Sequence, residues 1–168
     1  ALQPVLAQIA PRKLMDIGCG YGFFDLFAAR DLGADVILVD LETSEGAHSG
    51  FGEKHAGYSS LQTARKLLEA NGIAPARIEM INPREGDVMA AGPVDLVVSF
   101  LSCGFHYPAS TYSALFESTL KAGGRVILDL RAAEAAPQLA WFEGLAPLSM
   151  LMGPNKSQRI LAGQGVAA

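Results

Sequence analysis

Three glycines at alternate positions follow an apolar segment near the start of the chain. The acid Asp16 precedes them, and the turn itself is Gly18, Cys19, Gly20, Tyr21 and Gly22. The residues after the turn, 23–30, are apolar at helical spacing. A strand that turns through glycines into a helix presents free backbone N–H groups at the helix start, and such groups bind anionic parts of ligands. The pattern predicts a small-molecule site.

Two other interpretations of this turn remain open at this point. A dinucleotide-binding turn has the spacing G-x-G-x-x-G, whereas here the third glycine, Gly22, comes one position early. An ordinary strand–helix turn that binds nothing is the second alternative, because short glycine motifs occur by chance.

Residues 16–22 read D-x-G-x-G-x-G, which resembles the first motif of the class I S-adenosylmethionine-dependent methyltransferases. In that family the glycine turn lies against the methionine portion of the cofactor, and the acid helps to place its amino group. The resemblance implies that Asp16 and the five turn residues bind S-adenosyl-L-methionine.

Further acids occur where the resemblance requires them. Asp40 follows a second buried segment and lies 18 residues after Gly22, close to the ~20 residues expected for an acid that binds a ribose. The resemblance assigns this role to Asp40, with Leu41 beside it and Glu42 as a second candidate. Residues 85–88 resemble the third family motif, which assigns the adenine to Asp87 and Val88.

The resemblance extends to two later segments. Residues 94–100 resemble the strand 4 motif, which adds Ser99 and Phe100 to the cofactor-binding residues, and residues 120–129 resemble the helix–turn–strand entry to strand 5. Together these matches cover roughly residues 13–130, in the order that the family has them.

Two long loops supply the candidate catalytic and substrate residues. The loop 99–108 follows strand 4, and ligands of open α/β sheets bind beyond the carboxyl ends of the strands at the switch in strand order. His106 is the predicted catalytic base, although it could instead hydrogen-bond a backbone carbonyl. The predicted substrate-binding residues are Ser102, Phe105 and Tyr107 of this loop and His48 and His55 of the loop 42–58.

The acceptor is predicted to be an oxygen atom of a small molecule or sugar. The formal charge is −4 and the 13 Lys and Arg residues are scattered, so no basic stripe for nucleic acid is visible. An Asn/Asp-Pro-Pro-Tyr/Phe motif, often found in enzymes that methylate bases, is absent after strand 4, where residues 99–102 read Ser-Phe-Leu-Ser. We expect no nucleic-acid partner and no metal. An NAD(P)-binding oxidoreductase, or a non-catalytic cofactor-binding subunit, is the alternative function.

The elements that must position these residues alternate between strands and helices, which favours a parallel α/β sheet. The fold class predicted is a Rossmann-like doubly wound sheet of about seven strands, mostly parallel, with an antiparallel edge hairpin split by residues 153–155. The predicted strands are 13–17, 35–40, 77–81, 94–100, 125–130, 146–152 and 158–162. The predicted helices are 2–9, 21–31, 59–71, 111–121 and 134–143, the third of them capped by Ser59 with Gln62.

Composition agrees with a single domain covering residues 1–168. Half of the residues are hydrophobic and 18% are charged, and no apolar run approaches the ~18 residues of a membrane span. Two cysteines without a C-x-x-C partner predict neither a disulfide nor a zinc site, and favour the reducing cytoplasm. The first residue is Ala, which indicates a chain processed, trimmed or cut from something longer. An oligomer or a partner subunit stays open.

Overall fold

The computed structural model describes residues 2–41 and 60–164. Its seven strands form one sheet in the order β3-β2-β1-β4-β5-β7-β6. The strands are β1 (Lys13–Ile17), β2 (Asp35–Val39), β3 (Ile78–Ile81), β4 (Leu96–Ser99), β5 (Arg125–Arg131), β6 (Leu148–Leu151) and β7 (Ser157–Ala162). The first five are parallel, whereas β7 runs antiparallel to both β5 and β6. The predicted fold class, edge hairpin included, is confirmed.

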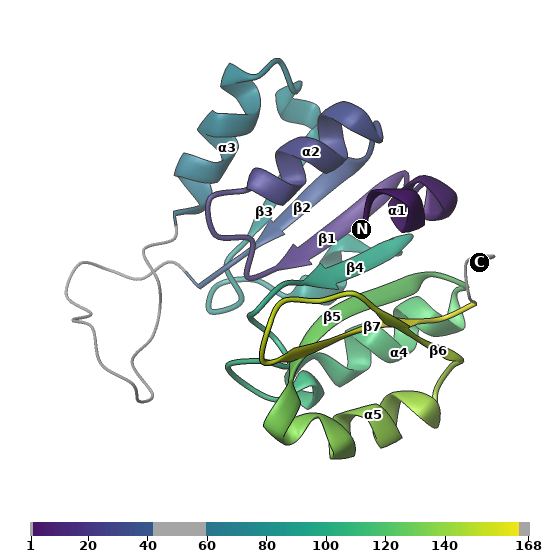
Figure 1. Cartoon of the computed structure of the whole chain (residues 1–168). Helices are drawn as coiled ribbons and strands as arrows, with labels where there is room; N and C mark the ends of the chain where they lie inside the picture. The colour runs from purple at the N-terminus through teal and green to yellow at the C-terminus, as the bar shows by residue number, and fades with distance from the viewer. Residues whose placement is uncertain (1, 42–59, 165–168) are drawn as a thin grey trace.

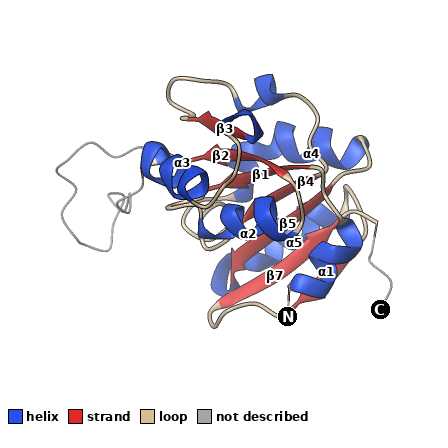
Figure 2. Cartoon of the chain, turned by 90° about the horizontal axis from the view of Figure 1, so that it is seen from above, coloured by secondary structure: helices blue, strands red, loops and turns tan. Residues whose placement is uncertain are grey.

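Helices cover both faces of the sheet (Figures 1 and 2). The α-helices are α1 (Gln3–Ile9), α2 (Phe23–Asp31), α3 (Leu61–Ala70), α4 (Ser113–Lys121) and α5 (Ala135–Glu143). Buried residues of α1, α2 and α3 pack in one apolar cluster, and those of α4 and α5 pack in another. The sheet therefore lies between two helical layers, as a doubly wound fold requires.

Strand β1 contributes side chains to both layers, because successive residues of a strand point to opposite faces. Met15 and Ile17 pack with the α4 and α5 cluster, while Leu14 packs with the cluster of α1, α2 and α3. Asp16 alternates with Met15 and Ile17 and so points to the same side as Leu14, the side that α2 covers. This alternation decides where the only acid of β1 lies.

The strand order reverses at the centre of the sheet. β1 pairs with β2 on one side and with β4 on the other, and all three are parallel. Their carboxyl ends consequently meet at one edge of the sheet, where the glycine turn, Asp40 and the 99–108 loop follow them. This is the position at which open α/β sheets bind ligands.

Three local predictions need correction. The N-cap of α3 is Ser60 rather than Ser59, because the Ser60 Oγ accepts a hydrogen bond from the Thr63 amide at 3.2 Å; Ser59 lies outside the described residues. Strand β4 begins at Leu96, two residues later than predicted, and β2 ends at Val39, one residue earlier than predicted. Within the described residues, no helix combines the length and apolarity needed to cross a membrane.

Candidate active site at the glycine turn

All three glycines of the turn adopt left-handed backbone conformations. Their φ angles are +79° at Gly18, +58° at Gly20 and +74° at Gly22, which is the N-cap of α2. Residues other than glycine rarely adopt this region, because their Cβ atom crowds the following carbonyl oxygen. The backbone alone therefore explains the residue type at each position.

The surroundings of the three glycines differ, and the difference locates open space. A Cβ atom on Gly18 would collide with the Ser102 side chain, and one on Gly22 would lie 3.1 Å from Leu68 Cδ1. A Cβ atom on Gly20 would have no described atom within 4 Å. Gly18 and Gly22 thus allow close packing inside the protein, whereas the space on the Cβ side of Gly20 is open.

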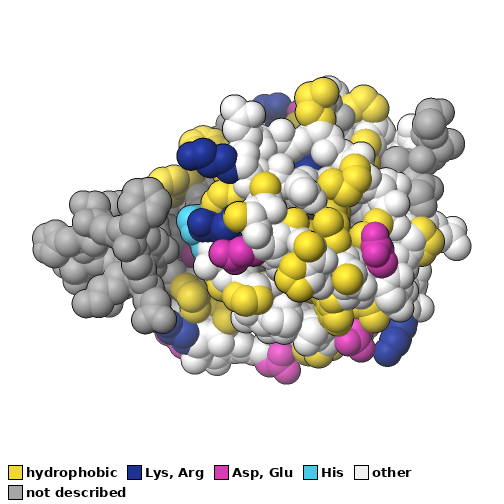
Figure 3. Space-filling model, turned by 60° about the horizontal axis from the view of Figure 1, so that its bottom comes forward, with side chains coloured by type: hydrophobic (Ala, Val, Ile, Leu, Met, Phe, Trp, Pro, Cys, Tyr) yellow, Lys and Arg dark blue, Asp and Glu magenta, His cyan; other side chains and the backbone are white. Residues whose placement is uncertain are grey.

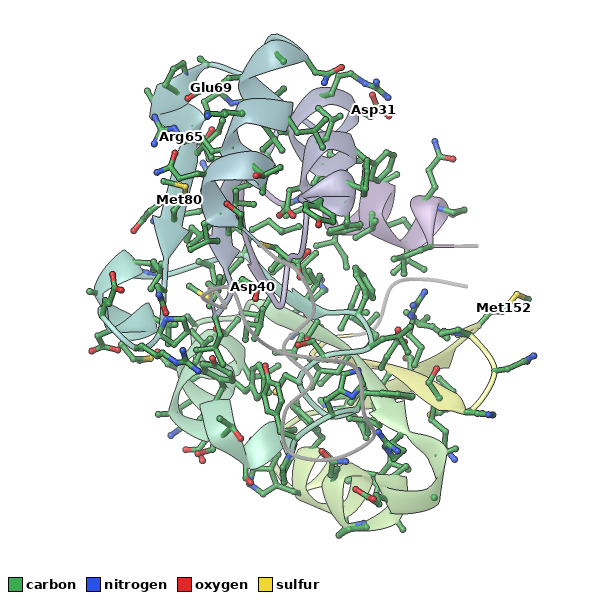
Figure 4. All side chains as sticks on the ribbon, turned by 90° about the vertical axis from the view of Figure 1, so that its left-hand side faces the viewer. Asp31, Asp40, Arg65, Glu69, Met80 and Met152 are labelled. Atoms are coloured by element: carbon green, nitrogen blue, oxygen red, sulfur yellow. The ribbon has the colours of Figure 1, made fainter. Side chains whose placement is uncertain are left out.

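Asp40 lies over this turn. The Gly20 amide donates a hydrogen bond to Asp40 Oδ2 at 2.9 Å. The Gly18 amide donates to the Val39 carbonyl at 2.7 Å, which ties the turn to the end of β2. Figure 4 shows Asp40 near the centre of the molecule, between the part that holds α2 and α3 and the part that holds α4 and α5. Leu41, next along the chain, is exposed.

Two buried carboxyl groups meet beneath the turn. Asp16 is 3% exposed at the carboxyl end of β1, and Asp25 is 0% exposed in the first turn of α2. Neither Asp16 Oδ1 nor either Asp25 oxygen has a hydrogen-bond donor among the described residues. Once one of the two groups takes up a proton it becomes a donor to the other, which explains how the pair is tolerated in the interior.

The electrostatics of this pair favour a shared proton. Burial, followed by repulsion from Asp25, raises the pKa of Asp16 well above its usual value. Burial also raises the pKa of Asp25, to about 7. Two carboxylates at one desolvated site cannot both ionise cheaply, so the proton belongs to the pair.

Asp87, predicted to contact the adenine, lies after β3 and immediately before η2 (Val88–Ala91), a short 3₁₀ helix. Its Oδ1 accepts a hydrogen bond from the Met89 amide at 2.8 Å and so caps this helix. Val88 is buried, whereas Asp87 is exposed. Both residues line a cavity of about 280 Å³ that extends to Tyr112 at the start of α4.

The end of β4 is held to the end of β1 by a buried hydroxyl group. Ser99 Oγ donates to the Ile17 carbonyl at 2.7 Å and accepts from the Cys103 amide at 2.9 Å, and Ser99 is 0% exposed. The side chain of Ser99 therefore orders the loop and has no surface for a ligand. Phe100 is partly buried, and its ring lies 4.8 Å from the ring of Phe24.

The 99–108 loop folds back over the glycine turn. Ser102 lies against Gly18, and its Oγ is 3.3 Å from the Tyr107 hydroxyl. Burial raises the pKa of the Tyr107 phenol, which consequently stays protonated at neutral pH. Phe105 and His106 stack edge to face at 5.3 Å between ring centroids, and His106 is exposed.

Neighbouring elements fix this loop. The Gly104 carbonyl accepts hydrogen bonds from the Arg131 amide at 3.0 Å and from the Gln138 amide nitrogen at 3.2 Å. Arg131 Nε also donates to the Phe105 carbonyl at 2.8 Å, and its guanidinium lies 4.7 Å from the Phe105 ring centre. The loop is therefore a fixed wall of the site.

The remaining predicted residues divide between buried, exposed and undescribed positions. Tyr21 is 43% exposed, while the Cys19 and Cys103 thiols are free and buried. Burial raises the pKa of the Cys103 thiol to about 12 and that of Cys19 further, so neither is a reactive thiolate. His48 and His55 lie outside the described residues. Over ranges 2–41 and 60–164, no three His, Cys, Asp or Glu residues are placed to hold a metal ion.

The glycine pattern did not identify Asp25 or Gln138. An acid inside the apolar segment 23–30 was a detectable signal for Asp25, because a charged residue on the buried face of a helix is rare unless it has a partner. Gln138 had no signal, since its contact with Gly104 joins positions 34 residues apart.

Comparisons with known proteins rest on structure alone. No protein-family model and no curated protein matches the sequence. Among solved structures, the methyltransferase domain of bacterial CtHen1-CN superposes with a TM-score of 0.64 at 15% identity, over 97% of this chain and 95% of that one. The chain has the class I methyltransferase fold.

Two other solved structures with this fold are described as different kinds of methyltransferase. A 16S rRNA methyltransferase from T. thermophilus, in complex with S-adenosylmethionine and guanosine, has a TM-score of 0.63 at 21% identity over 98% of this chain. An O-methyltransferase family protein from Burkholderia thailandensis has a TM-score of 0.58 at 13% identity over 99% of this chain. The chain spans 41% of the first and 57% of the second, so the likeness concerns the methyltransferase fold and not the whole of either protein.

Proposed function

We propose that this chain is an S-adenosylmethionine-dependent methyltransferase that transfers the methyl group to an oxygen of a small molecule or sugar. The fold is compatible with this activity, but many activities share one fold, so the argument must come from the site. The observation that carries the proposal is the open main chain at Gly20, with a buried acid on one side and an uncapped helix on the other.

The residues of the turn fit the amino-acid half of this cofactor. An ammonium group requires an anion or acceptors, and Asp16 Oδ1 is a buried acceptor without a donor among the described residues. A carboxylate requires N–H donors, and the N-cap of α2 is Gly22, which has no side chain to cap the first amide groups of the helix. Because a Cβ atom at Gly20 would meet no described atom within 4 Å, a ligand can approach the backbone there.

The nucleoside half would lie along the ends of β2 and β3. The hydrogen bond from the Gly20 amide holds the Asp40 carboxylate at the turn, where it can accept hydrogen bonds from ribose hydroxyls. Leu41 adds an exposed apolar surface beside it. Asp87 and Val88, which line the cavity next to η2, would contact the adenine.

Catalysis in this proposal depends mainly on alignment. The cofactor supplies an electrophilic methyl group, and the fixed 99–108 loop restricts how an acceptor can approach it, a kind of positioning worth up to about 7–11 kcal/mol. His106 is exposed in this loop and would take the proton of an acceptor hydroxyl, because imidazole is the side chain that most often serves as a general base. Tyr107 stays protonated and so cannot act as a base, but its hydroxyl can donate or accept a hydrogen bond and its ring can contact the acceptor.

Surface charge supports a small acceptor. On the face in Figure 3, Lys and Arg side chains lie in separate places among acidic and hydrophobic ones, without a continuous basic stripe. Nucleic-acid enzymes obtain much of their affinity from such a stripe. The sheet itself disfavours the oxidoreductase alternative, because β7 is antiparallel to its neighbours, whereas dinucleotide-binding sheets are parallel.

The test has two stages. Thermal shift and calorimetric titration with S-adenosylmethionine and, separately, NAD and NADP should show binding of the first alone. Methyl transfer from labelled cofactor is then measured into a small-molecule extract and into purified RNA of the same cells. We expect label in the small-molecule fraction; label in RNA alone would overturn the acceptor class, and binding of NAD alone would overturn the proposal.

A further inference from the structure

The Asp16–Asp25 pair is more elaborate than cofactor binding requires. One carboxylate suffices to pair with an ammonium group, yet the protein buries a second one beneath it, at 0% exposure. A buried and unpaired charge is costly, so its presence needs an explanation. Resting on the proposed function, we infer that the buried Asp16 and Asp25 hold a shared proton in the free protein and release it when a cationic amino group binds at Asp16.

The elements around the pair supply no compensating cation. Asp25 and Asp40 are the charged groups that act on Asp16, and both raise its pKa. In the sheet, Asp16 lies between Leu38 of β2 and Val98 of β4, and Cys19 is the other titratable group nearby, held as a neutral thiol. From α3, Ala64 and Leu68 pack against Gly22. No Lys or Arg in the described part of the chain acts on either acid.

Such surroundings make the proton state depend on the ligand. Without a cation, a second negative charge in this apolar site is unfavourable, so one carboxyl O–H bond persists. An ammonium group beside Asp16 supplies the missing positive charge and favours the doubly ionised pair. The O–H bond then breaks, its proton passes to water, and no other covalent bond changes.

The coupling between proton release and cofactor binding predicts the direction in which the affinity changes with pH. Because the ligand prefers the deprotonated pair, its affinity rises with pH while the pair still holds the proton, and becomes constant above that range. Burial raises the pKa of both acids, so affinity should rise with pH over the range in which the pair of the free protein still holds protons, which includes the acidic side of neutrality. An α-amino group remains protonated over this interval, since it titrates near pH 8.

Calorimetry measures directly how many protons are released when the cofactor binds. S-adenosylmethionine is titrated at pH 6 into the whole chain in two buffers of different ionisation enthalpy, which gives the number of protons released on binding. We expect release of about 0.5 proton per cofactor or more in the unmodified protein. In Asp25→Asn the amide can donate to Asp16 and keep it ionised, so the release should fall to near zero and affinity should lose its pH dependence.

Asp31→Asn is the matched control, because Asp31 lies at the end of the same helix, is exposed, and pairs with Arg30. It should release the same number of protons as the unmodified protein. Binding without proton release in the unmodified protein would overturn the inference and leave the proposed function intact, as would equal release from Asp25→Asn. Absence of cofactor binding at every pH would instead contradict the proposed function, and the inference with it.

Discussion

A single methyl group at Gly20 offers a quantitative test of the site. Gly20→Ala places a Cβ atom in a left-handed residue at φ +58° where no described atom lies within 4 Å. The conformation costs about 1–2 kcal/mol for a residue with a side chain, and nothing in the protein adds a collision. We therefore expect the free energy of unfolding to fall by about 1 kcal/mol.

Gly33 provides a control with the same backbone conformation away from the turn. It lies just after α2 at φ +75°, is exposed, and would also accept a Cβ atom without a described neighbour within 4 Å. Gly33→Ala should lower stability by a similar amount, about 1 kcal/mol. The two variants thus differ only in whether the new methyl group faces the proposed cofactor.

Binding should separate the two variants. In Gly20→Ala the methyl group occupies space that the ligand needs, and such crowding costs about 1–3 kcal/mol, which is roughly 5- to 150-fold in dissociation constant. Gly33→Ala should bind like the unmodified protein. Urea denaturation gives the stabilities and calorimetric titration with S-adenosylmethionine gives the affinities. Unchanged affinity in Gly20→Ala, or equal losses in both variants, would refute the assignment of Gly20.

Three further predictions concern charge and catalysis. In Asp25→Asn, urea melts across pH should show the unmodified protein losing stability relative to the variant as pH rises from about 4 to 7, by up to about 1.4 kcal/mol per unit. The native state keeps a proton there that the unfolded chain has released. Arg159 donates two hydrogen bonds of 2.7 Å to the buried Asp129 carboxylate, and Arg159→Ala leaves this carboxylate unpaired. It should cost about 3–5 kcal/mol in the same melts, and a loss below about 1 kcal/mol would contradict this account. His106→Asn should lower kcat about 10²- to 10⁴-fold with cofactor affinity unchanged, and an unaltered kcat measured by methyl transfer would exclude His106 as the base.

The elements of this fold are largely predictable, because the pattern that specifies them is local. Apolar runs that end in an acid predicted β1 and β2, and Gly-Pro-Asn at 153–155 predicted the turn between β6 and β7. The boundaries of the elements are less predictable from sequence, since the energetic difference between neighbouring caps is small. Ser60 reaches the Thr63 amide, and nothing in the residue type distinguished it from Ser59.

The site was predictable only where its geometry comes from the backbone. Positive φ angles at the three glycines follow from their spacing, and Asp40 follows from the length of one helix and one strand. The roles of Ser99 and Asp25 depend on tertiary contacts instead. Ser99 Oγ bonds Ile17, 82 positions away, and Asp25 meets Asp16 only because strand alternation and the first turn of α2 direct both inward. Local patterns carry no information on such contacts.

The central claim is that the glycine turn binds S-adenosylmethionine through its main chain, and amide NMR tests it most directly. The backbone resonances of Gly20 and Gly33 are followed while the cofactor is added to the whole chain. We predict a saturable shift for Gly20, with Gly33 unmoved. Saturable shifts confined to a second cavity, which is distinct from the one beside Asp87 and is lined by Pro93, Val94 and Thr119 among others, with Gly20 unmoved, would contradict the account.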